Sequence, residues 1–262
     1  EVAEVTYTVI PPTGTAGTGP GGVGYQDLSR AGQPELSMWL KADGISGATD
    51  GSEITEWPDA SGNENDGYNT WVDGGDNGIP NTGESQKQPP VYREGTLNGL
   101  PVLEFGATAG EKGSIVVDDA DNLDGGEGIS LFMVSRRNEM YGDFAALIQK
   151  RDISAPGDDQ EAYVFEMNGG SNPNEMQWVL ARDLFVRNDS IIDDERYYLF
   201  NVGLNGDHGL GYFITNGFLD NTAAYGRPVQ ATHAPVIIGG FQAMNIAEVV
   251  AFNSTVNMAQ TL

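Results

Sequence analysis

The stretch YYLFNVGLNGDHGLGYFITNGFLDNTA (197–223) decides the fold class. Its apolar runs YYLFNVGL (197–204) and GYFIT (211–215) are separated by turn-forming residues, and Asn216-Gly217 follows the second run. Short runs rich in Tyr, Phe and Val are typical of β-strands, and Asn-Gly between apolar runs favours the tight turn of a β-hairpin. The stretch therefore predicts antiparallel strands joined by short connections.

The same pattern recurs along the chain from Leu36 onward. The other short apolar runs are LSMWL (36–40), PVLEF (101–105), SIVV (114–117), ISLFMVS (129–135), FAALI (144–148), AYVFEM (162–167), MQWVLA (176–181), PVIIGG (235–240) and IAEVVAF (246–252). Clusters of Gly, Asn, Asp and Pro bound these runs, and no segment sustains the period of an amphipathic helix. We predict an all-β fold, an antiparallel two-sheet β-sandwich of the jelly-roll type, as one domain over residues 25–262.

Residues 1–24 have a different character. Residues 1–10 alternate like a strand, and residues 11–24 consist almost wholly of Pro, Gly, Thr and Ala. We interpret 1–24 as the end of an upstream module followed by a linker; the alternative is a flexible end. The chain opens on EVAE rather than on a signal peptide, so we expect it to be part of a longer protein.

Composition excludes several kinds of function. The chain has 262 residues with 38 acidic and 13 basic side chains, a formal net charge of −25, two histidines and no cysteine. This excludes disulfides, Cys-ligated metals and thiol catalysis, and the charge disfavours nucleic acid. No apolar stretch has the length of a membrane-spanning helix, so we expect no membrane insertion. High acidity without cysteine suits a secreted bacterial protein.

Four segments carry a resemblance to a known family. They are LSMWLKADGIS (36–46), ITEWPDASGNENDGY (54–68), QPPVYREGTLNGLPVLEFG (88–106) and APVIIGGFQAMNIAEVVAFNSTVNMAQTL (234–262). Their succession resembles the concanavalin A-like, laminin G-type (LamG-like) jelly-roll domains of large secreted bacterial proteins. The resemblance implies the jelly-roll fold and an extracellular or cell-surface location, and it implies no particular ligand.

Individual positions in these segments carry structural expectations. Trp57 is expected to fill the core, and Ser61-Gly62-Asn63 to form a tight turn. Asn98-Gly99 is a second hairpin signal. Strand alternation places Ile246, Glu248 and Val250 on one face, where we expect the Glu248 carboxylate to accept hydrogen bonds from backbone groups rather than to do chemistry.

Calcium is the predicted cofactor, because carboxylate and amide oxygens are the ligands that it prefers. The candidate ligands lie in one turn: Asp59, Asn63, Asn65 and Asp66. The alternative is a solvated acidic turn. The resemblance to the LamG-like family implies that the Asp118–Asp124 stretch is a connecting loop.

Carbohydrate is the predicted ligand, since sugars are bound by aromatic rings together with Asp, Asn and Gln side chains. The candidate aromatic residues are Tyr68, Trp71, Tyr92 and Trp178. Each of the first three is alternatively a loop anchor, and Trp178 faces either the core or a concave sheet. Arg136, Arg137, Lys150 and Arg151 form a basic group that either contacts an acidic polysaccharide or balances neighbouring carboxylates.

The function favoured by this pattern is a non-catalytic carbohydrate-recognition module within a larger adhesin or polysaccharide-utilisation protein. Two alternatives stay open: a polysaccharide-degrading enzyme, hydrolase or lyase, on the same fold, and a structural spacer or protein-binding domain of a cell-surface adhesin. No strand carries the paired carboxylates that glycoside hydrolysis needs. The interpretation therefore favours binding over catalysis.

Overall fold

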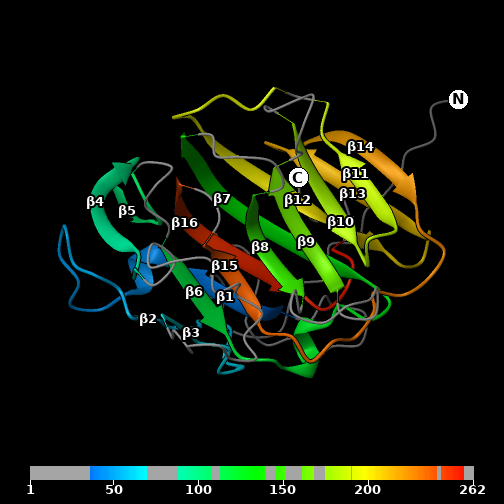
Figure 1. Ribbon diagram of the computed structural model, residues 1–262, viewed down its shortest axis with the longest axis horizontal. Coiled ribbons are helices and arrows are strands. Elements are labelled where there is room, and N and C mark those ends of the chain that lie inside the picture. The colour runs from blue at the N-terminus through cyan, green and yellow to red at the C-terminus, as the bar shows by residue number, and fades with distance from the viewer. Residues whose placement is uncertain are drawn as a thin grey trace, which may run out of the picture. The chain divides into compact units, whose positions relative to one another are not determined.

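The computed structural model describes residues 36–69, 88–107, 113–139, 145–151, 161–167, 175–189, 191–240 and 243–256, all within one compact unit, Pro34–Leu262. The predicted upstream strand and linker (1–24) lie outside the described residues. Two antiparallel eight-stranded sheets lie one behind the other (Figure 1). The predicted all-β, two-sheet sandwich is confirmed. This part of the chain contains no helix of the length and hydrophobicity that a membrane crossing requires.

Each sheet draws on strands from the whole length of this unit. Sheet A contains β1 (Leu36–Lys41), β4 (Val91–Leu97), β5 (Leu100–Glu104), β7 (Ile129–Glu139), β12 (Tyr197–Asn205), β13 (Leu210–Thr215), β14 (Phe218–Ala224) and β16 (Ala243–Phe252). Sheet B contains β2 (Glu56–Trp57), β3 (Gly67–Tyr68), β6 (Ser114–Val117), β8 (Ala146–Arg151), β9 (Glu161–Met167), β10 (Met176–Leu180), β11 (Leu184–Arg187) and β15 (Val236–Gly239). Short 3-10 turns, η2 (Ala42–Gly44) and η4 (Asp121–Leu123), follow β1 and β6.

Both predicted Asn-Gly hairpins form. Asn98-Gly99 joins β4 to β5 with φ angles of 52° and 84°, and Asn216-Gly217 joins β13 to β14 with φ angles of 52° and 83°. Positive φ at both central residues is the geometry of the type I′ turn, whose twist matches that of the flanking strands. The local sequence therefore sets the register of both hairpins.

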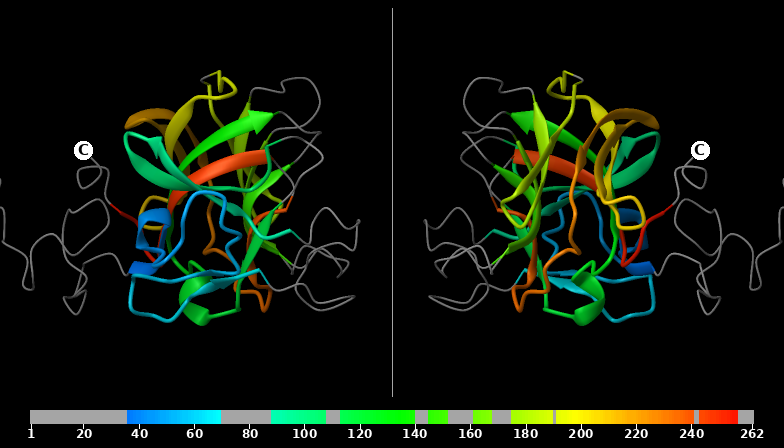
Figure 2. Two further views of the ribbon diagram at one scale, coloured as in Figure 1. Left: turned by 90° about the vertical axis from the view of Figure 1, so that its left-hand side faces the viewer. Right: turned by 90° about the vertical axis from the view of Figure 1, so that its right-hand side faces the viewer.

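Strand β16 is the centre of sheet A. It pairs with β7 along one edge, and along the other it pairs first with β5 and then with β1. Figure 2 shows the orange-red β16 beside the green β7 from two opposite sides. The last strand, β16, thus links the first strand, β1, to the central strand β7 of sheet A.

A bulge between Ile246 and Glu248 corrects one expectation about β16. Ile246 and Val249 both lie in the core, so the alternation shifts by one residue and Glu248 lies on the opposite face from Ile246. The predicted common face of Ile246, Glu248 and Val250 is therefore wrong. The Glu248 carboxylate accepts a hydrogen bond from the Trp39 indole at 2.5 Å, so its partner is a side chain rather than the backbone. Burial raises the pKa of Glu248.

The inner faces of the two sheets share one hydrophobic core. Trp57 is fully buried beside Phe105, with 6.2 Å between ring centroids, which confirms its predicted structural role. Trp178 is also fully buried, and its ring stacks on Tyr163 with 5.5 Å between centroids.

A buried ion cluster closes the core near η4. Lys150 pairs across the ladder with Tyr163 and Val236, both core residues, so its side chain points between the sheets, where it is fully buried. Its ammonium contacts Asp119, lies 3.2 Å from Asp124, and donates to the carbonyls of Ala234 at 2.7 Å and Thr232 at 3.1 Å. These four oxygen partners compensate a desolvated charge.

Replacing this ammonium tests how much the cluster contributes to folding. Lys150→Met leaves Asp119 and Asp124 without their cation, so we expect a loss of about 3–5 kcal/mol in the free energy of unfolding. Denaturant titration measures it. The triple variant with Asp119→Asn and Asp124→Asn removes the repulsion and should recover part of the loss. A loss below about 1 kcal/mol in the single variant contradicts this account.

Candidate functional site

The four predicted calcium ligands come together in one turn, where their side chains make hydrogen bonds within the protein. The Asp59 carboxylate accepts the backbone N–H groups of Trp39 at 2.8 Å, Ser61 at 2.9 Å and Asn65 at 3.1 Å, and the Ser61 hydroxyl at 2.5 Å. Asp66 accepts the Asp59 N–H at 2.6 Å.

The two asparagines of this turn present donors to the neighbouring strand. The amide nitrogen of Asn63 donates to the Leu36 carbonyl at 2.7 Å, and that of Asn65 donates to the Ser37 carbonyl at 2.8 Å. The Asp59 carboxylate is saturated with N–H and O–H donors, which argues against this carboxylate as a calcium ligand, and calcium at this turn stays a prediction. Among the described residues, no group of three or more acidic or histidine side chains is placed to hold a metal.

This turn instead fastens β1 to the loop that follows it. Asp59→Asn puts an amide nitrogen where the carboxylate accepts hydrogen bonds, so we expect a loss of about 2–3 kcal/mol of stability, equal in calcium and in EDTA. Thermal and denaturant unfolding measure it. Glu64→Gln, an exposed position in the same turn, is the matched control and should be neutral. A loss that appears only when calcium is present argues for a metal in this turn.

The predicted aromatic residues are scattered. Trp178 and Tyr92 belong to the core, with exposed fractions of 0% and 8%, which leaves their rings no free face for a sugar. Tyr68 is 36% exposed on β3 and donates to Asp66 at 3.4 Å. Trp71 lies outside the described residues. Tyr68 alone of the described three presents a surface to a ligand.

The basic group of the sequence is also divided. Arg137 and Lys150 are buried. Arg137 pairs with the Asp194 carboxylate, and Lys150 pairs with the Asp119 carboxylate near η4. Arg151 lies 3.7 Å from Glu161. These three side chains balance carboxylates, as the second interpretation expected.

Arg136 belongs to a different arrangement, a polar row across the outer face of sheet A, the face turned away from sheet B. Tyr197 of β12 pairs with Arg136 of β7, Arg136 pairs with Asn245 of β16, and Asn245 pairs with Glu104 of β5. Directly paired residues point to the same face. Four adjacent strands thus align these residues, hereafter the sheet A row, over about 14 Å, given a strand spacing of about 4.8 Å.

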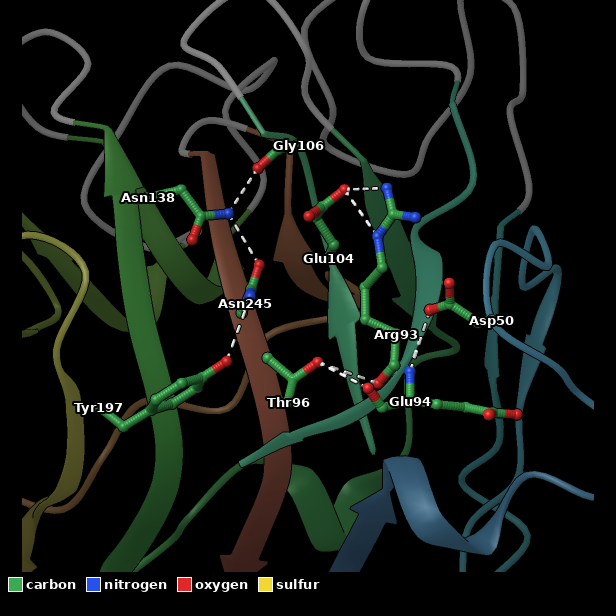
Figure 3. A network of polar contacts seen from close by, with 9 residues as sticks. All are labelled: Asp50, Arg93, Glu94, Thr96, Glu104, Gly106, Asn138, Tyr197 and Asn245. Carbon is green, nitrogen blue, oxygen red and sulfur yellow. Dashed lines mark hydrogen bonds and ion pairs between the residues drawn. The ribbon is translucent and has the colours of Figure 1, made fainter. Parts of the chain in front are cut away.

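Hydrogen bonds hold the sheet A row in position (Figure 3). Asn138, two residues after Arg136 on β7, donates to Asn245 at 2.7 Å and to the Gly106 carbonyl at 2.8 Å. Asn245 donates to the Tyr197 hydroxyl at 3.2 Å. At the other end, Arg93 of β4 makes a 2.6 Å ion pair with Glu104.

Several polar groups of the row remain available to a ligand. Arg136 uses Nε to donate to Asn138 at 3.1 Å, and its guanidinium lies 5.3 Å from the Tyr197 ring centre. Within the described part of the chain, its Nη groups, the Glu104 Oε2 atom and the Tyr197 hydroxyl proton have no hydrogen-bond partner. Donors, an acceptor and an aromatic edge therefore lie together on a rigid surface.

A second polar row crosses the outer face of sheet B. Glu166 of β9 pairs with Gln177 of β10, and Gln177 pairs with Arg187 of β11. Gln177 donates to the Glu166 Oε1 atom at 2.7 Å and accepts from Arg187 at 3.4 Å. Glu166 is 5% exposed, and burial raises its pKa to about 6 against the opposing effects of Gln177 and Arg151.

The raised pKa of Glu166 makes folding dependent on pH. Because its pKa in the folded protein lies above the ordinary 4.5, the protonated form stabilises the fold below pH 4.5, and this contribution is lost as the pH rises through about 6. The shift corresponds to about 2 kcal/mol. We expect the stability of Glu166→Gln relative to the parent protein to rise by that amount between pH 4.5 and 7. Urea titrations across this range measure it, and a constant difference refutes it.

Sequence reasoning missed both rows. Their residues are polar positions inside apolar runs, such as Glu104 in PVLEF and Gln177 in MQWVLA, or lie beside them. A polar residue at a strand position marks an outward side chain at most. Which of these residues stand side by side depends on pairing between distant strands, which the apolar pattern does not specify.

Many solved structures share the sandwich fold. Domain 4 of AbnA, a GH43 extracellular arabinanase from Geobacillus stearothermophilus solved with arabinotriose, superposes with a TM-score of 0.59 at 13% identity, over 87% of this chain and 97% of that one. The binding domain of Paraclostridial Mosquitocidal Protein 1 matches with a TM-score of 0.56 at 11% identity, over 86% of this chain and 50% of that one. Trypanosoma rangeli sialidase, solved with 2,3-difluorosialic acid, matches with a TM-score of 0.53 at 13% identity, over 86% of this chain and 32% of that one.

At these identities the likeness shows the fold alone. The chain spans nearly all of the arabinanase domain, half of the toxin binding domain and about a third (32%) of the sialidase. No protein-family model matches the chain, and no match to a curated protein was found.

Proposed function

We propose that this chain is a non-catalytic carbohydrate-recognition module of the laminin G type, carried by a secreted or cell-surface protein, and that it binds glycans on the sheet A row. The observation that carries the proposal is the alignment of Tyr197, Arg136, Asn245 and Glu104 by direct pairing of four adjacent strands. Calcium stays a prediction, and the tests below are run with and without it.

The chemistry of the row suits a saccharide. Sugar hydroxyls both donate and accept, and they are recognised by planar groups such as guanidinium, amide and carboxylate. Arg136 supplies donors, Glu104 an acceptor, and Tyr197 an aromatic body with a hydroxyl. Because hydrogen bonds hold Asn138 and Asn245 in place, a ligand meets a surface that is already ordered.

Binding suits the row better than hydrolysis. Glycoside hydrolysis needs two carboxyl groups flanking the scissile bond. The row contains one carboxylate, Glu104, which Arg93 already pairs. The Glu248 carboxylate on the same face accepts the Trp39 indole.

The structural neighbours support the proposal by their own ligands. The arabinanase domain was solved with arabinotriose, and the sialidase with a sialic acid derivative. Botulinum neurotoxin type C interacts with ganglioside molecules. Its structure matches with a TM-score of 0.54 at 11% identity, over 87% of this chain and 50% of that one. The extracellular arabinanase also supports a location outside the cell.

A glycan array followed by calorimetry tests the proposal. The probes are arabinotriose, sialyllactose and neutral and acidic plant and marine polysaccharides, each in calcium and in EDTA. We expect Arg136→Ala and Tyr197→Ala to weaken binding at least tenfold, as loss of about 1.4 kcal/mol or more of contact energy implies. Tyr68→Ala, on the other sheet, is the control and should bind like the parent chain.

Two results would overturn this assignment. Binding that is lost in Tyr68→Ala and retained in Arg136→Ala moves the site to the loops around β3. Failure to bind any glycan in either buffer favours the spacer or protein-binding alternative.

A further inference from the structure

Arg136 differs from most arginines of the described chain because it has no carboxylate partner. Arginines that form an ion pair with an acidic side chain are Arg93, Arg137, Arg151, Arg182 and Arg227. Arg187 and Arg196 form none, but both are exposed, and water solvates their charge. Arg136 is partly buried, and its hydrogen-bond partner among the described residues is the neutral side chain of Asn138. Its charge therefore stands without a counter-charge inside the sheet A row.

Two contacts fix the direction in which the Arg136 guanidinium faces. Its Nε atom donates to Asn138 at 3.1 Å, and its central carbon lies over the Tyr197 ring, 5.3 Å from the ring centre. Asn138 is itself held by the Gly106 carbonyl and by Asn245 (Figure 3). The edge of the guanidinium that carries both Nη groups is therefore the part that a ligand can meet, and it is positioned before the ligand arrives.

This end of the sheet A row offers mainly donors. Both Arg136 Nη groups carry N–H bonds, and the Tyr197 hydroxyl, which accepts from Asn245 at 3.2 Å, keeps its own proton to donate. An ionised carboxylate only accepts, and its two oxygens match two parallel N–H bonds of a guanidinium. A neutral sugar hydroxyl uses this set of donors less fully, because it also carries a proton.

The other end of the row has the opposite character. Glu104 lies two strands from Arg136, about 10 Å away at the usual strand spacing. Its Oε1 atom accepts from Arg93, whereas its Oε2 atom has no partner among the described residues. A carboxylate in this position accepts from sugar hydroxyls and repels a second anion. The row thus fits a saccharide whose acidic group is at one end and whose hydroxyls extend about 10 Å further along.

The immediate surroundings of Arg136 accommodate an anion in spite of the net charge of −25. The residues that pair directly with it, Tyr197 and Asn245, are uncharged. Glu248 lies on the same face one step along β16, and its own ladder partner on the far side is Lys41. Carboxylates farther away are screened at physiological ionic strength, where the Debye length is about 8 Å.

We propose that the sheet A row selects acidic saccharides. The carboxylate of a sugar acid accepts from both Arg136 Nη groups and from the Tyr197 hydroxyl, and a hydroxyl of the neighbouring sugar residue donates to Glu104 Oε2. This inference rests on the proposed function, because it names the ligand class of the same site. Arg136 is the residue that determines specificity.

Saccharides that differ only at the carboxyl group test this preference. The probes are trigalacturonate, trimannuronate and sialyllactose, each beside its own methyl ester, measured by calorimetry with and without calcium in about 0.15 M NaCl. We expect at least one acid to bind at least tenfold more tightly than its ester. In Arg136→Gln, which keeps an amide donor and loses the charge, this ratio should fall to about one. Arg136→Lys keeps the charge without the planar fork and should give an intermediate ratio.

Arg187→Gln is the matched control. It removes the same charge from an exposed arginine on sheet B, so the ratio of acid to ester affinity should stay that of the parent chain. Thermal unfolding of each variant checks that it is folded. A ratio that falls equally in Arg187→Gln assigns the preference to net charge and overturns the role of Arg136.

The remaining outcomes separate this inference from the proposed function. If acid and ester bind equally and Arg136→Ala weakens both, the row is a glycan site, but its selection of acids is overturned. Binding of a carrageenan oligosaccharide, which carries sulfate and no carboxylate, together with none of the sugar acids, also overturns the inference while the row remains a glycan site. Failure of every saccharide to bind overturns both proposals.

Discussion

The bulge in β16 is the constraint on which sheet A depends. It lies where the partner on one edge changes from β5 to β1, so that Asn245 and Ile246 pair with one strand and Glu248 to Phe252 with another. One extra residue allows a single strand to serve two partners while Ile246, Val249 and Ala251 all remain in the core. It also directs Asn245 outward, into the centre of the sheet A row.

The two outer faces differ in how their polar groups are satisfied. On sheet A, Asn138, Asn245 and Tyr197 bond to one another, and the row retains donors and acceptors at its rim. On sheet B, Glu166 and Gln149 are buried with polar atoms unpaired. The first arrangement is that of a preorganised surface, whereas the second leaves buried polar atoms unpaired. A sandwich offers both because each sheet has one face outside the core.

Local signals predicted local features of the fold. The two Asn-Gly turns and the buried Trp57 follow from residues adjacent in sequence, and most strands follow from apolar runs. The exposed strand β14, with the sequence FLDNTAA, contains no apolar run and was indicated only by the Asn216-Gly217 turn before it, because an edge strand with little burial needs no apolar pattern. Glu248 was placed on the wrong face because a bulge adds a residue without changing composition. The prediction of calcium at Asp59 did not take into account that the backbone N–H of Trp39 in β1 donates to the same carboxylate.

Non-local pairing decided the rest. Trp178 sits in a run that reads equally well with either face inward, and only its neighbours Tyr163 and Phe165 fix the choice. Likewise, nothing in the sequence states that Arg136 stands between Tyr197 and Asn245, positions roughly 60 and 110 residues away. Site residues that are assembled from four strands are invisible to spacing arguments.

The Lys150 cluster has a consequence for how this end of the sandwich behaves in different surroundings. Its cation is part of the polypeptide, so occupancy is one per chain at any ionic composition, and no chelator can remove it. A bound ion in the same oxygen cage would make this junction respond to the medium. The lysine makes the junction insensitive to the ionic composition of the medium. In return, Lys150 becomes a position where substitution strongly destabilises the fold.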